Sequence, residues 1–103
     1  MGLIKTLDFK GYEPNYWFIA DIRPDFKLQR TTIALALYKD AATRAVDKAS
    51  GSYANKIDRS NYPPEISLVT VDGVGLSYEE MYDAIKENQT NTFFHDAVDE
   101  LNI

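Results

Sequence analysis

The strongest constraint on the fold is an alternating pattern of apolar side chains that covers residues 16–38. In residues 16–23, and again in residues 31–38, side chains of similar character recur at every second position, which is the period of a β-strand. Between these two stretches, Pro24 has a fixed φ and Asp25 favours a turn. The pattern therefore predicts two antiparallel strands that fold back on each other as a β-hairpin.

The register of this hairpin is predicted from the burial of its apolar side chains. If the chain reverses at residues 26–27, one face is nearly all apolar, with the pairs Ile22–Thr31, Ala20–Ile33, Phe18–Leu35 and Tyr16–Leu37. A slip of one residue would turn the apolar set of one strand towards water, so burial favours this pairing. The opposite face keeps Trp17, Ile19 and Tyr38, and we expect a helix or another chain to cover it.

Two further strands and one helix are predicted outside the hairpin. Residues 3–10 predict a first strand and residues 65–71 a fourth. Short connections make the first three strands an antiparallel meander, because a parallel connection would need a longer crossover. Residues 41–49 are rich in alanine and predict two turns of a weakly anchored helix. Residues 50–64 are polar and predict a long loop, either functional or simply a mobile part of the surface.

The C-terminal part predicts two helices. Ser77 and Glu80 have the spacing of a capping box, and apolar residues at positions 78, 81, 82 and 85 form one stripe of the helix that follows. A second short helix, capped by Thr92, is predicted over residues 93–101. The predicted fold class is therefore α+β, with an antiparallel meander sheet of about four strands and two C-terminal helices packed on it. Residues 1–103 are expected to form a single domain.

Composition excludes several classes of protein. The chain has no cysteine, which excludes disulfides, thiolate zinc sites and thiol catalysis and fits a reducing compartment. The N-terminus lacks the charged, apolar and small-residue segments of a signal peptide. Apolar runs are far shorter than the roughly 20 residues of a membrane-spanning helix. We therefore expect a soluble protein that is not secreted by a signal peptide and has no membrane partner.

Charge is distributed unevenly along the chain. Residues 1–38 carry five basic and four acidic side chains, residues 39–62 carry five and three, and residues 63–103 carry one and nine. Because nucleic-acid binding needs clustered Lys and Arg, this distribution argues against a nucleic-acid partner. The acidic C-terminal part has two interpretations: a solvated helix face that keeps the protein soluble, or a surface that binds a basic protein.

No arrangement of residues demands a particular reaction. His95 is the only histidine, so acid–base catalysis at neutral pH would depend on it or on a carboxylate with a displaced pKa. His95 and Asp99 alone are too few ligands for a dedicated metal site. Four acidic residues fall on the solvent side of the capped helix: Glu79, Glu80, Asp83 and Glu87. We therefore expect no enzymatic activity, no catalytic residue, no metal ion and no cofactor.

Aromatic and apolar residues outside the predicted core are the best functional candidates, because such residues often anchor protein contacts. The predicted protein interface consists of three residues on the second hairpin face and three in the long loop: Trp17, Ile19, Tyr38, Tyr53, Ile57 and Tyr62. The alternative for Trp17 is a core position beneath the second C-terminal helix.

Several segments together resemble the small proteins encoded among the structural genes of tailed bacteriophages and prophages. They are Tyr16-Trp17-Phe18-Ile19, the strand of residues 34–40 with its continuation into residues 41–44, the tyrosine-rich capped helix, and residues 93–99. The resemblance implies a non-enzymatic part of a virion in the tail or baseplate region. It also implies assembly in the host cytoplasm and a ring-forming homo-oligomer as one possible form. It defines no functional residue.

Three hypotheses of function follow. The first is a structural or assembly protein that contacts neighbouring subunits. The second is an intracellular binding module or small regulator that captures a basic protein partner on its acidic C-terminal helices. The third is an enzyme that uses His95 with Asp96 or Asp99, which would require His95→Ala to abolish a measured turnover.

Overall fold

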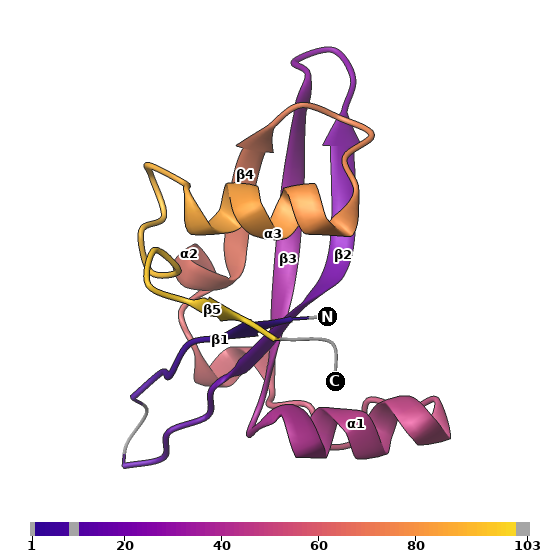
Figure 1. Cartoon of the computed structure of the whole chain (residues 1–103), viewed down its shortest axis with the longest axis vertical. Coiled ribbons are helices and arrows are strands. Elements are labelled where there is room, and N and C mark those ends of the chain that lie inside the picture. The colour runs from indigo at the N-terminus through magenta and orange to yellow at the C-terminus, as the bar shows by residue number, and fades with distance from the viewer. Residues whose placement is uncertain (1, 9–10, 101–103) are drawn as a thin grey trace.

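The computed structural model describes residues 2–8 and 11–100. It has an α+β fold built on a five-stranded antiparallel sheet of order β4-β3-β2-β1-β5 (Figure 1), so the predicted class and strand orientation are confirmed. The strands are β1 (Leu3–Ile4), β2 (Tyr16–Asp25), β3 (Arg30–Tyr38), β4 (Leu68–Asp72) and β5 (Val98–Asp99). The helices are α1 (Ala41–Ser50), the 3₁₀-helix η1 (Arg59–Asn61), α2 (Pro64–Ser67) and α3 (Tyr78–Lys86).

The β2–β3 hairpin forms as predicted, but its predicted register is wrong. Tyr16 pairs with Tyr38 and Phe18 with Ala36, so the two strands are shifted by one residue from the predicted pairing. A β-bulge between Ile19 and Asp21 then adds one residue to β2. Residues 16–19 are apolar on both faces, so the alternation of side chains does not decide which face is buried.

Because of the bulge, odd-numbered β2 residues before it and even-numbered residues after it point to the same face of the sheet. Before the bulge, Trp17 and Ile19 point into the main core, and after it Ile22 does so. These side chains meet the alternate residues of β3 and β4, together with α3 and Phe94. The Tyr82 hydroxyl of α3 accepts a hydrogen bond from the Ile19 N–H at 2.9 Å, beside the bulge. Burial raises the pKa of Tyr82 to about 12, so this hydroxyl stays protonated at neutral pH.

A second, smaller cluster lies on the other face at the α1 end of the sheet. Four buried residues form it: Tyr16, Phe18, Ala36 and Tyr38. Helix α1 lies beside this end of the sheet, far from the β2–β3 turn (Figure 1). The helix begins after Asp40, whose carboxylate accepts from the Thr43 N–H at 2.8 Å, and it ends at Gly51 in the left-handed conformation. The predicted helix over residues 41–49 is therefore confirmed.

The predicted capping box of α3 is also confirmed. The Ser77 hydroxyl accepts from the Glu80 N–H at 3.1 Å, and the Glu80 carboxylate accepts from the Ser77 N–H at 3.0 Å. These bonds satisfy two backbone donors that the first turn of a helix leaves unpaired, and they hold the pKa of Glu80 below its usual range. Three residues of the predicted stripe, Met81, Tyr82 and Ile85, are buried against the sheet, whereas Tyr78 is exposed.

Replacing Ser77 with alanine is expected to lower the free energy of unfolding by about 1 kcal/mol, because the Glu80 N–H loses its acceptor. Urea denaturation followed by circular dichroism would measure the change. Ser60→Ala is the control, because the Ser60 side chain caps no α-helix and lies in an exposed 3₁₀-turn. A Ser77→Ala variant as stable as the Ser60→Ala variant would contradict the capping role.

The second predicted C-terminal helix does not form in the described residues. Residues 93–96 make a turn, and Val98–Asp99 become strand β5, which pairs with β1. Asn88 favours this path, because its side chain accepts hydrogen bonds from the N–H groups of Thr90 and Asn91. Phe94 is buried in the main core and anchors the turn. Residue 101, the last residue of the predicted helix, lies outside the described residues.

Two predicted strands have different bounds. The first is only Leu3–Ile4 instead of residues 3–10, and residues 9–10 lie outside the described part. The fourth begins at Leu68 instead of Glu65, because Pro64 starts the short helix α2, where a missing N–H costs nothing.

Candidate protein interface

In the part of the chain that the structure describes, one face of the sheet lacks a covering layer between the bulge and the hairpin turn. Val69, Val71 and Ile33 point from β4 and β3 into the main core, so their sequence neighbours point to the opposite side. We call this opposite side the open face and define it by six half-exposed or exposed residues: Asp21, Arg23, Thr32, Ala34, Leu68 and Thr70. Leu68 is 42% exposed in spite of its apolar side chain. The open face is therefore accessible to a partner.

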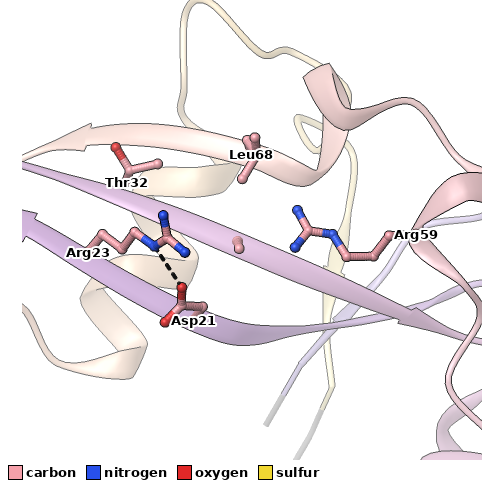
Figure 2. Close-up of a pocket in the computed structure, with 6 residues that line it drawn as sticks. Asp21, Arg23, Thr32, Arg59 and Leu68 are labelled. Carbon is pink, nitrogen blue, oxygen red and sulfur yellow. Dashed lines mark hydrogen bonds and ion pairs between the residues drawn. The ribbon is translucent and has the colours of Figure 1, made fainter.

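A shallow pocket of about 210 Å³ lies on the open face (Figure 2). Arg23 of β2 and Arg59 of η1 extend into it from opposite sides, Leu68 lies between them, and Thr32 lines the pocket beside Arg23. The Arg23 Nε lies 2.9 Å from the Asp21 carboxylate, which neutralises part of its charge. Within the described residues, no ion pair joins Arg59 to a carboxylate. The pocket thus carries two guanidinium groups and one carboxylate.

The bulge and the loop before α2 create this pocket. Without the extra residue near Ala20, the side chains of Asp21 and Arg23 would point to the main core, and Ile22 would point to solvent. Arg59 reaches the sheet from η1, where Asp58 caps the turn by accepting from the Ser60 N–H at 2.9 Å. The long loop therefore contributes a charged residue to a surface that is otherwise built by the sheet.

The structure places four of the six residues of the predicted interface in the core. Trp17, Ile19 and Tyr62 are buried in the main core, and Tyr38 is buried in the smaller cluster. Ile57 is partly buried against the main core. Trp17 lies beneath Phe94 of the C-terminal turn, so the core alternative holds for this residue, although the covering segment is no helix.

Tyr53 is the one predicted interface residue that remains on the surface, at 59% exposure. Its ring stacks on Phe18 with 6.2 Å between the centroids. The guanidinium carbon of Arg44 lies 4.4 Å from the Phe18 centroid and 5.2 Å from the Tyr53 centroid. These cation–π contacts hold the loop after α1 against the sheet and occupy one side of the Tyr53 ring.

The exposed side of α3 is acidic. Glu79, Glu80, Asp83 and Glu87 are all exposed. Lys86 lies beside them, but its ammonium is shared between Asp83 at 3.5 Å and Asp99 at 2.8 Å. We call these four residues the acidic face of α3. They line no described pocket, and they lie on the solvent side of the helix as the sequence predicts.

The three residues considered for catalysis are each engaged elsewhere. The His95 Nε2 lies 2.6 Å from the Asn88 carbonyl oxygen, on the protein surface. Asp96 pairs with Lys5 at 2.7 Å, which holds the pKa of its carboxyl below the usual range, and Asp99 pairs with Lys86. Across residues 2–8 and 11–100, no three His, Asp or Glu side chains converge as metal ligands. In the structure, His95, Asp96 and Asp99 thus each contact a different part of the chain.

No protein-family model matches the chain, and no curated protein and no solved structure matches it with significance. Of the helices in the described part of the chain, none has the length and apolar character needed to cross a membrane.

Proposed function

We propose that the protein is a non-enzymatic structural subunit that assembles by protein–protein contacts. The open face carries this proposal, because a sheet normally buries both faces or exposes a fully polar one. Here the exposed side combines Ala34 and Leu68 with two arginine side chains around a pocket. Arginine and apolar residues are typical of protein interfaces, and a second layer would remove Leu68 from water.

The β2–β3 turn supports the same role. Phe26 and Leu28 at the tip are 69% and 58% exposed. The Asp25 carboxylate accepts from the N–H groups of Lys27 and Leu28 at 3.0 and 3.1 Å, so the tip has a defined conformation. A projecting, ordered turn with two apolar side chains is suited to insertion into a neighbouring subunit.

The biological setting that we propose is the tail or baseplate region of a tailed phage or prophage virion. The support for this setting is the resemblance of residues 16–19, 34–44 and 93–99 to the small structural proteins of those phages. The subunit would be made in the host cytoplasm and would then enter the virion.

Light scattering at several protein concentrations tests the proposal. We expect the average mass of the purified chain to rise with concentration and to reach a multimer of defined size. A chain that stays monomeric at every concentration would overturn self-assembly. Replacing both Phe26 and Leu28 with serine then measures how much the tip contributes, since neither side chain supports the core.

The acidic face of α3 favours a second candidate function, the capture of a basic protein partner. Its four exposed carboxylates belong to a chain of net charge −5, and such a surface attracts basic partners over about a Debye length. A persistent monomer that binds a basic protein in low salt, and releases it as salt rises, would favour this function over assembly.

A further inference from the structure

We propose that the open face binds the acidic face of α3 from a second copy of the chain, so that copies stack head to tail. The inference rests on the proposed assembly function and names the partner and the two surfaces. The pocket of Arg23 and Arg59 would receive carboxylates of the neighbouring helix (Figure 2). Arginine suits this task, because its planar guanidinium group binds a carboxylate through two parallel hydrogen bonds.

The charges of the two surfaces are complementary. Glu79, Asp83 and Glu87 follow one another at intervals of four residues and form a row of carboxylates about 12 Å long on the outer side of α3. Lys86 is the only Lys or Arg after position 62, and its contacts with Asp83 and Asp99 leave most of the row negative. Arg59 lies on the open face, which would meet this row of a neighbouring copy. It has no ion pair with a described carboxylate.

The shape of the open face also suits a helix. Ala34 and Thr32 are small residues at the centre of the face, so a helix could approach the strands closely there. Helix α3 already covers the main-core face of the same strands, where Met81 and Ile85 are buried. A second helix on the open face would complete a helix–sheet–helix arrangement and would cover Leu68.

The two surfaces lie on opposite sides of one sheet, which determines the kind of assembly. When the acidic face of one copy binds the open face of the next, the first copy still has a free open face and the last copy a free acidic face. Such a heterologous contact repeats until it closes as a ring or continues as a filament. The expected assembly is therefore larger than a dimer.

Charge reversal on either surface is expected to block stacking. The variant Arg23→Glu/Arg59→Glu reverses the pocket, and Glu79→Lys/Glu87→Lys reverses the ends of the carboxylate row. Each variant alone should raise the concentration needed for half-maximal association by about tenfold or more, because two attractive pairs become repulsive. An equimolar mixture of the two variants should assemble again, since each reversed surface then meets a complementary one. Light scattering at low salt measures all three samples.

A matched control separates local contacts from net charge. Lys39→Glu/Lys48→Glu changes the net charge by the same amount as the arginine variant, at two exposed sites outside both surfaces and outside the β2–β3 tip, and should assemble like the unchanged protein. If the unchanged chain assembles and both reversed variants assemble equally well, the assembly function stands and this interface is wrong. A mixture that fails to reassemble, although both variants melt at the temperature of the unchanged protein, would also overturn it. An unchanged chain that stays monomeric would overturn the assembly function itself.

Discussion

Replacing Trp17 with alanine is expected to lower the free energy of unfolding by about 3–5 kcal/mol, which is a large share of the stability of a small domain. The Trp17 side chain is fully buried and meets Tyr62, Phe93 and Phe94 edge-on, with 5.5, 5.7 and 5.2 Å between the ring centroids. Its Nε1–H donates to the Lys5 carbonyl at 2.8 Å. Alanine would leave a large cavity where β2, the long loop and the C-terminal turn meet.

Urea denaturation followed by far-ultraviolet circular dichroism would measure this loss, because Trp17 is the only tryptophan and the variant lacks its fluorescence. Tyr53→Ala is the matched control: it also removes an aromatic ring, but from an exposed position, and should cost about 1 kcal/mol or less. Trp17→Phe should fall between the two, since it refills part of the cavity. Equal stability of the Trp17→Ala and Tyr53→Ala variants would contradict a core role for Trp17.

The hairpin shows how far an alternating pattern determines a fold. The period of two in residues 16–23 and 31–38 was sufficient to predict both strands and their antiparallel order. It was insufficient for the register, because Tyr16 and Phe18 are as apolar as Trp17 and Ile19, and both sets are buried in the structure. Where both faces are apolar, only packing against the rest of the chain selects the register.

Whether each helix could be predicted depended on how much of its sequence signal comes from contacts within the helix itself. The capped helix α3 was predictable, since the side chains of Ser77 and Glu80 each accept a hydrogen bond from the other residue's backbone N–H. The second C-terminal helix was wrongly predicted, because its outcome depends on distant partners. Phe94 packs on Trp17, and Val98 pairs with Ile4 of β1, far away in the sequence. Tertiary contacts here outweigh a weak local preference for helix.

The candidate site was the least predictable part. Exposed aromatic residues are reasonable interface candidates, but sequence alone did not reveal that Trp17 and Tyr38 are fully buried. The pocket depends on the bulge, which turns Arg23 to the open face, and on Arg59, which lies outside the sheet strands in sequence. The alternation of Asp21 and Arg23 was a usable signal for a polar sheet face, whereas nothing local connects Arg59 to that face.

Tyr38→Phe is expected to lower the free energy of unfolding by about 2 kcal/mol, because it removes a hydrogen bond to a buried charged group. The Tyr38 hydroxyl donates to the Asp47 carboxylate at 2.8 Å, and both residues are almost completely buried. The N–H and side-chain amide of Asn55 donate to the same carboxylate, each at 2.8 Å. Asp47 thereby joins β3, α1 and the long loop, and phenylalanine preserves the packing while it removes one donor.

The dependence of this loss on pH distinguishes a lost hydrogen bond from altered packing. Burial by itself raises the pKa of Asp47, but the hydrogen bonds from Asn55 and Tyr38 together hold it below its ordinary value of 3.8. A carboxyl whose pKa is lowered by folding contributes stability above its ordinary pKa and loses that contribution as the pH falls further. The difference in the free energy of unfolding between the unchanged protein and Tyr38→Phe should therefore be constant near neutral pH. It should become smaller as the pH falls below about 3.8. Urea denaturation at a series of pH values would measure it, and a difference that stays constant into acid would attribute the loss to packing instead.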